Sequence, residues 1–93
     1  MSTEFIRSKL SSIIEQYNVK RVSLFGSRAA GTNREDSDVD LIMEFNGPVT
    51  LMMLSAIKYQ LEDELGLSVD LIHGPITDDD MIEIGSEVEL YAA

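Results

Sequence analysis

The chain has 93 residues, no cysteine and a net charge of -10, and these properties exclude several classes of protein. A chain of this length forms one small domain, which we expect to span residues 1–93. The lack of cysteine excludes a disulfide framework and a thiolate zinc site, and the apolar runs are too short to cross a bilayer. We therefore expect a soluble, cytoplasmic protein with no role in a membrane.

The negative charge lies in the C-terminal part of the chain. Residues 1–58 hold all 7 Lys and Arg residues against 7 acidic ones, whereas residues 59–93 hold 10 acidic residues and neither Lys nor Arg. Binding to nucleic acid needs clustered cations, so free DNA or RNA is not an expected ligand. An acidic surface suits a basic protein partner, although it also serves simply to keep a domain in solution.

The first predicted element is a helix of about four turns that Ser2 or Thr3 can cap. Its apolar stripe at helical spacing consists of Phe5, Ile6, Leu10, Ile13, Ile14 and Tyr17. Residues 22–25 form a short β-prone run that stops at Gly26, and residues 27–30 can open a short helix. Residues 39–45 form a second strand, which stops at the turn signals of residues 46–48.

A second long helix is predicted between Thr50, as its N-cap, and Gly66, as its terminator. Its main face is lined by Leu51, Leu54, Ile57, Lys58, Leu61 and Leu65. Residues 69–72 form a third strand, and Thr77 with Asp80 resembles the capping box of a short last helix. Residues 87–91 alternate charged and apolar side chains, which indicates a final edge strand. This alternation of helices and strands predicts an α/β (α+β) fold.

The most specific feature is Gly26-Ser27, followed ten residues later by Asp38-Val39-Asp40. Side chains two apart in a strand share a face, so the two carboxylates project together and repel each other unless cations lie between them. Hard oxygen ligands suit Mg2+, and polymerase-type chemistry uses two such ions about 3.5 to 4 Å apart. Asp70 is the natural third carboxylate, because it stands in an otherwise apolar strand. If the three strands are neighbours, the three carboxylates converge.

The other half of this predicted site is the turn at Gly26. Glycine allows close backbone approach, and the free N–H groups of the following turn, with the Ser27 hydroxyl, can face a triphosphate. Arg28 and Arg34 are the only basic residues between the two halves of the site. Either can pair with phosphate or with a neighbouring acid, and we take Arg28 as a candidate nucleotide-binding residue together with Gly26 and Ser27.

Three segments resemble the minimal nucleotidyltransferase family of the DNA polymerase beta superfamily, small antitoxin partners of HEPN-domain toxins. They are residues 24–31 (Leu-Phe-Gly-Ser-Arg-Ala-Ala-Gly), 36–41 (Asp-Ser-Asp-Val-Asp-Leu) and 69–71 (Val-Asp-Leu). The resemblance implies a single-domain nucleotidyltransferase fold with a small mixed sheet flanked by helices. It implies that Gly26 and Ser27 bind ATP and that Asp38 and Asp40 ligate two Mg2+. It also implies that Asp70 ligates the catalytic ion and helps to deprotonate the acceptor.

The reaction implied by the resemblance is transfer of AMP from ATP to a tyrosine hydroxyl of a cognate HEPN-type ribonuclease toxin, which inactivates the toxin. Many relatives have Arg at the position of Ala30 and basic residues in the segment that here reads Asp-Asp-Asp-Met-Ile-Glu (residues 78–83), which favours a slow or partner-dependent enzyme. One alternative is an antitoxin that blocks the toxin sterically without catalysis. Another is a small-molecule nucleotidyltransferase, against which the lack of a second domain argues. Asp38, Asp40 and Asp70 are essential only in the catalytic readings.

Overall fold

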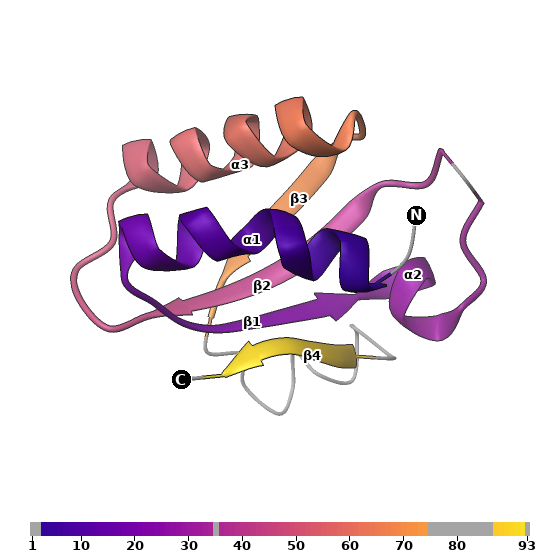
Figure 1. Cartoon of the computed structure of the whole chain (residues 1–93), viewed down its shortest axis with the longest axis horizontal. Helices are drawn as coiled ribbons and strands as arrows, with labels where there is room; N and C mark the ends of the chain where they lie inside the picture. The colour runs from indigo at the N-terminus through magenta and orange to yellow at the C-terminus, as the bar shows by residue number, and fades with distance from the viewer. Residues whose placement is uncertain (1–2, 35, 75–86, 93) are drawn as a thin grey trace.

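The computed structural model describes residues 3–34, 36–74 and 87–92, which form three helices and four strands. In chain order these are α1 (Thr3–Tyr17), β1 (Val19–Phe25), α2 (Gly26–Ala30), β2 (Val39–Phe45), α3 (Leu51–Leu65), β3 (Val69–His73) and β4 (Glu87–Ala92). The strands form one sheet in the order β3-β2-β1-β4 (Figure 1). The β2–β3 pair is parallel, whereas β1 pairs antiparallel with both β2 and β4. The prediction of an α+β fold with a small mixed sheet is therefore confirmed.

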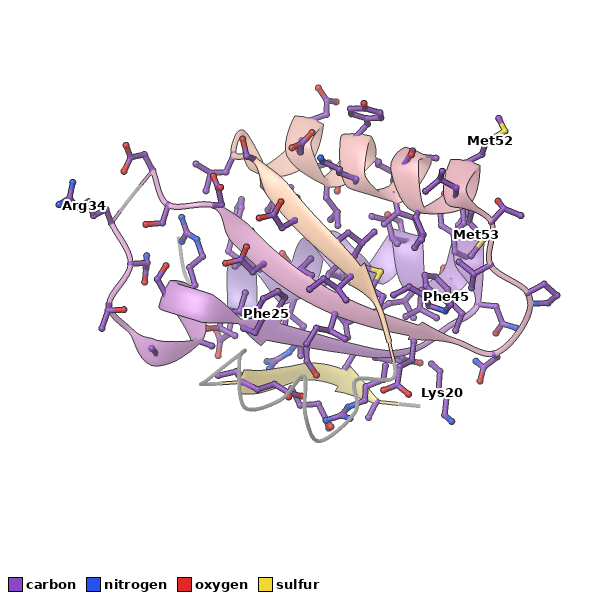
Figure 2. The ribbon with its side chains drawn as sticks, turned by 180° about the vertical axis from the view of Figure 1, so that it is seen from behind. Lys20, Phe25, Arg34, Phe45, Met52 and Met53 are labelled. Atoms are coloured by element: carbon purple, nitrogen blue, oxygen red, sulfur yellow. The ribbon has the colours of Figure 1, made fainter. Side chains whose placement is uncertain are left out.

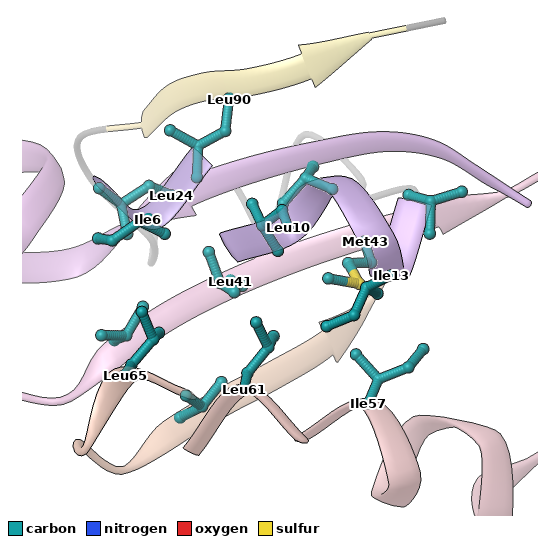
Figure 3. Close-up of a cluster of buried hydrophobic side chains, with 14 residues drawn as sticks. Ile6, Leu10, Ile13, Leu24, Leu41, Met43, Ile57, Leu61, Leu65 and Leu90 are labelled. Carbon is teal, nitrogen blue, oxygen red and sulfur yellow. The ribbon is translucent and has the colours of Figure 1, made fainter. Parts of the chain in front are cut away.

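Helices α1 and α3 lie on the same face of this sheet (Figure 1). Buried side chains of both helices meet the inward side chains of the strands in one apolar core (Figure 3). The core includes Ile6, Leu10 and Ile13 of α1, Ile57, Leu61 and Leu65 of α3, and Val22, Leu24, Val39, Leu41, Met43, Val69 and Leu90 of the strands. Because the core takes one face of the sheet, alternate strand residues are left for the opposite face.

Both predicted ends of α3 are confirmed. Thr50 accepts a hydrogen bond from the Met53 N–H at 3.1 Å, and Gly66 adopts φ +70° with its N–H donating to the Glu62 carbonyl at 2.9 Å. The prediction that Leu51 shares the buried face is wrong, because its side chain is 80% exposed. Leu51 is the first residue of α3, at the end of the helix farthest from the buried Leu61 and Leu65. Met52 is also exposed and points away from the molecule (Figure 2).

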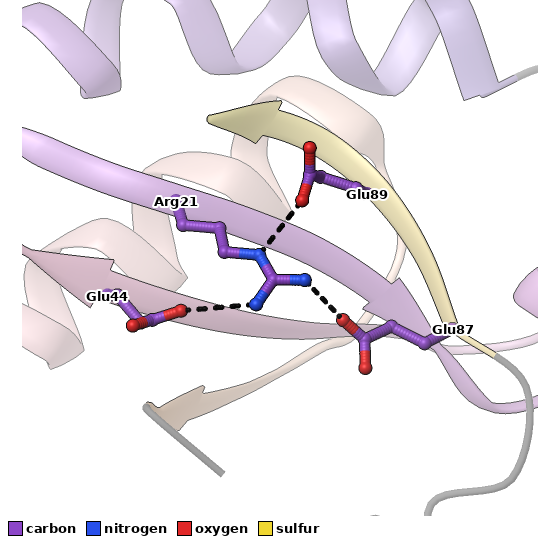
Figure 4. A network of polar contacts seen from close by, with 4 residues as sticks. All are labelled: Arg21, Glu44, Glu87 and Glu89. Atoms are coloured by element: carbon purple, nitrogen blue, oxygen red, sulfur yellow. Dashed lines mark hydrogen bonds and ion pairs between the residues drawn. The ribbon is translucent and has the colours of Figure 1, made fainter. Parts of the chain in front are cut away.

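Strand β1 begins three residues before its predicted start at residue 22. Lys20 and Arg21 interrupt the apolar run, yet Val19 is buried and pairs with Phe45. Arg21 extends from the sheet to three carboxylates of neighbouring strands, at 3.6 Å from Glu44 and 3.1 Å from each of Glu87 and Glu89 (Figure 4). The charged positions thus belong to the strand because their partners lie beside them on β2 and β4.

Strand β4 confirms the predicted edge strand and occupies the edge of the sheet next to β1. The predicted capping box of Thr77 and Asp80 lies outside the described residues, as does Ser2. Within the described ranges, none of the helices is long and apolar enough to cross a membrane.

Candidate active site

The parallel pairing of β2 with β3 brings two of the three predicted carboxylates together. The register places Asp40 directly beside Asp70, and hydrogen bonding between their side chains is among the causes that raise the pKa of Asp40. The preceding residues, Val39 and Val69, are 0% and 1% exposed because they point into the core. Two adjacent strands therefore present one carboxyl group each to the face that the long helices do not cover.

Asp38 lies one residue before β2 and is exposed. Its charge acts on Asp40, since it is among the causes that raise the pKa of the Asp40 carboxyl. Within residues 3–34, 36–74 and 87–92, no three His, Cys, Asp or Glu side chains are grouped closely enough to hold a metal ion. The structure thus gathers Asp40 and Asp70 into contact and leaves Asp38 as a nearby third charge.

The electrostatics of the site are those of crowded like charges. The pKa of Asp40 is raised from 3.8 to about 6, chiefly by burial and then by the hydrogen bond with Asp70 and the charges of Asp70 and Asp38. Arg28 acts in the opposite direction and lowers the pKa of Asp40. A cation between the carboxylates would relieve this repulsion, and paired carboxylate oxygens are suitable ligands for Mg2+.

The glycine turn lies against the same carboxylates. Phe25, the last residue of β1, is opposite Asp40, and Gly26 follows with φ +75°. A Cβ atom at Gly26 would collide with the Oδ2 atom of Asp40, so the position requires glycine both for its backbone angle and for its space. Gly26 opens helix α2, one residue before the predicted start at Ser27, and no side chain caps the start of this helix. The two segments inferred from the sequence therefore lie next to each other.

Arg28, on α2, is buried, with 9% of the residue exposed. Its Nε and Nη2 atoms both donate to the carbonyl oxygen of Ser37, at 3.2 and 2.7 Å. Ser37 was missed as a site residue at the sequence level, because a backbone acceptor leaves no signal in the spacing of side chains. A contact of Arg28 with nucleotide remains a prediction.

The raised pKa of Asp40 gives an expected pH dependence of stability. Between about pH 4 and pH 6 the folded state keeps a proton that the unfolded state has lost, so the free energy of unfolding falls as pH rises. Asp40→Asn removes this contribution, because the amide stays neutral and can still donate to Asp70. In metal-free buffer, the variant's stability relative to wild type should rise by about 1 kcal/mol across this window, a value discounted for the partial exposure of Asp40. Urea unfolding at several pH values tests this, and a constant difference would contradict it.

A glycine turn pressed against paired carboxylates on one sheet face is the arrangement expected of an enzyme that binds a nucleotide with a divalent cation. Residues 6–89 match the family model described as "Nucleotidyltransferase domain", and the chain belongs to this family. The prediction of an enzyme of the nucleotidyltransferase type is thereby confirmed.

Known proteins from archaea resemble the chain in sequence. A protein of Methanocaldococcus jannaschii, named as a candidate protein adenylyltransferase, is 39% identical over 72 residues, which cover 77% of each chain. Protein adenylyltransferase MntA of Thermococcus cleftensis is 38% identical over 58 residues, which cover 62% of this chain and 59% of the relative.

Solved structures share the fold. A structure named as a candidate minimal nucleotidyltransferase is 32% identical, with a TM-score of 0.71 and 90% of each chain covered. A toxin-antitoxin crystallised with AMP-PNP is 18% identical, with a TM-score of 0.77 over 94% of this chain and 73% of the other. A complex of tri-AMPylated Shewanella oneidensis HEPN toxin with MNT antitoxin is 14% identical, with a TM-score of 0.72 over 99% of this chain and 74% of the other. At these low identities, the last two show likeness of fold alone.

Proposed function

We propose that the chain is a Mg2+-dependent antitoxin that transfers AMP from ATP to a tyrosine hydroxyl of a cognate HEPN-type toxin and so inactivates it. The observation that carries this proposal is the contact between Asp40 and Asp70 beside the turn at Gly26. The relatives named as protein adenylyltransferases and the complex with an AMPylated HEPN toxin support the choice of acceptor.

The carboxylates fit the metal that the reaction needs. Asp40 and Asp70 supply adjacent oxygen ligands, and Asp38 supplies a third from the residue before β2. We propose that these residues hold two ions, which would neutralise the phosphate charge and clamp the attacking and leaving oxygens. Because Mg2+ is commonly bound through one or two carboxylates plus phosphates, the separation of Asp38 from the other two suits a site that ATP completes.

The residues of the chain would bind and orient the reactants. Gly26 and Ser27 would hold the triphosphate through the backbone N–H groups of the turn and the Ser27 hydroxyl. Asp70 would take the proton of the acceptor hydroxyl, whose oxygen then bonds to the α-phosphorus of ATP. The bond from that phosphorus to the α–β bridging oxygen breaks, and pyrophosphate leaves.

The exposure of two of the carboxylates suits a protein acceptor. Asp38 and Asp70 are exposed, so a docked toxin could bring its acceptor tyrosine to them. The net charge of -10 favours a partner with a basic surface.

The test is transfer of label to the partner. The purified chain, Mg2+ and the toxin encoded beside its gene are incubated with ATP labelled either at the α-phosphate or at the γ-phosphate. We expect label on a toxin tyrosine only from α-labelled ATP, and none after the tyrosine is changed to phenylalanine. Label from the γ-phosphate would indicate a kinase, and neutralisation of the toxin without any label would indicate a steric antitoxin.

A further inference from the structure

Arg28 connects the glycine turn to the loop that carries Asp38. Arg28 is a buried residue, and a buried charge is costly unless it is well paired. Two of its N–H groups converge on one acceptor, the Ser37 carbonyl oxygen, at 3.2 and 2.7 Å. Hydrogen bonds from a charged donor are stronger than neutral ones, so the backbone immediately before Asp38 is firmly held to α2.

The backbone on the other side of Asp38 is held as well. The Val39 N–H donates to the Ser68 carbonyl at 2.9 Å, and Ser68 directly precedes the strand that carries Asp70. A turn further supports Ser37, whose N–H donates to the Arg34 carbonyl at 3.2 Å and whose Oγ accepts from the Arg34 N–H at 2.8 Å. Asp38 is therefore an exposed side chain on a backbone fixed from both directions.

We propose that Arg28 is a positioning residue that holds Asp38 in place for metal binding, by fixing the Ser37 carbonyl to the helix that follows the glycine turn. The inference rests on the proposed function, in which Asp38 is a metal ligand. It assigns Arg28 to the backbone beside the carboxylates and not to the phosphates of the nucleotide. Mutation of a residue that orients a metal ligand without touching the metal typically lowers metal affinity about 10-fold to 100-fold.

Loss of Arg28 has opposite expected effects on metal affinity, depending on whether its charge or its anchoring of the backbone matters. A cation beside carboxylates repels a divalent ion, so loss of the charge alone would strengthen metal binding. Loss of the anchor would weaken it, because Asp38 would no longer be held in the geometry that binds the ion. At about pH 8 Asp40 is ionised in wild type, which keeps its titration out of the comparison. The direction of the change in affinity therefore separates the two roles.

The experiment measures binding of Mn2+ alone to the nucleotide-free chain, from the electron paramagnetic resonance signal of free Mn2+. Mn2+ prefers the same oxygen ligands as Mg2+. Arg28→Gln is expected to raise the dissociation constant about 10-fold, and Arg28→Lys about 3-fold, because lysine keeps the charge but not the two-donor fork. The control is Lys20→Gln, which also removes one positive charge. Lys20 is exposed and lies far from Arg34, which is in the loop that leads to Asp38 (Figure 2), so this variant is expected to bind Mn2+ as wild type does.

Hydrogen exchange provides a second measurement without metal. The Val39 amide is expected to exchange about 10-fold faster in Arg28→Gln, whereas the Gly66 amide at the end of α3 stays unchanged, which excludes global unfolding. Equal or tighter Mn2+ binding in Arg28→Gln, or full wild-type binding in Arg28→Lys, would overturn the inference. If wild type itself does not bind Mn2+ without nucleotide, the carboxylates alone do not hold the ion, and the exchange rate of Val39 alone decides whether Arg28 positions this loop.

Discussion

Asp40→Asn is expected to transfer nucleotide about a thousandfold more slowly than wild type, because a neutral amide cannot replace a carboxylate that binds the catalytic cation. The same change should stabilise the fold at neutral pH, since it removes a charge crowded by Asp70 and Asp38. Loss of activity with gain of stability is the signature of a site that crowds like charges for function. Initial rates of α-label transfer and urea unfolding of the same protein samples measure both effects.

The matched control is Asp63→Asn, which makes the same substitution on the exposed side of α3. It should leave transfer unchanged. A second experiment combines Asp38→Asn and Asp40→Asn in one double variant and measures how well it protects cells from the toxin. If this double variant neutralises the toxin as well as wild type does, transfer is not the basis of neutralisation, and the proposal of an enzymatic antitoxin is wrong.

Much of the fold could be predicted where one residue type has one physical role. The N-cap at Thr50, the left-handed terminator Gly66 and the strand over residues 39–45 each depend on residues close by in the chain, and the structure confirms them. The start of β1 was missed because the role of Arg21 depends on Glu87 and Glu89, far away in the chain. Local patterns carry no information about such partners.

The candidate site divides in the same way. Gly26, Ser27 and the Asp38-Val39-Asp40 segment are recognisable from spacing, and the shared face of the carboxylates follows from strand geometry. The contact of Asp40 with Asp70 depends on the parallel pairing of β2 with β3. The sequence alone does not show which strands are neighbours. The carbonyl acceptor of Arg28 could not be found from side-chain types at all. Register and backbone partners are thus the parts that need a three-dimensional structure.

The buried neighbours of the carboxylates explain how a small domain can tolerate a destabilising site. The carboxylates of β2 and β3 repel each other, and neither Asp40 nor Asp70 contributes to the apolar core. Their valine neighbours, Val39 and Val69, are buried and anchor both strands at the level of the site. Burial of apolar side chains on one face of the sheet therefore offsets the repulsion between Asp40 and Asp70 on the other face.

Gly26→Ala is expected to reduce transfer about a hundredfold, the cost of displacing a reacting group by roughly 1 Å. Two effects act at this position. The backbone angle of φ +75° is unfavourable for alanine, and the new Cβ would meet the Oδ2 atom of Asp40. Because Asp40 lies directly beside Asp70 in the sheet, a displaced Asp40 side chain would also disturb the second carboxylate.

Gly31→Ala separates the two effects. Gly31 has φ +77°, close to that of Gly26, but a Cβ atom there would meet nothing within 4 Å. Both variants should therefore lose about 1 kcal/mol of stability from the backbone angle, whereas only Gly26→Ala should lose transfer. Thermal unfolding and α-label transfer measured on both proteins make the comparison. Equal activity in the two variants would mean that the proximity of Gly26 to Asp40 has no catalytic role.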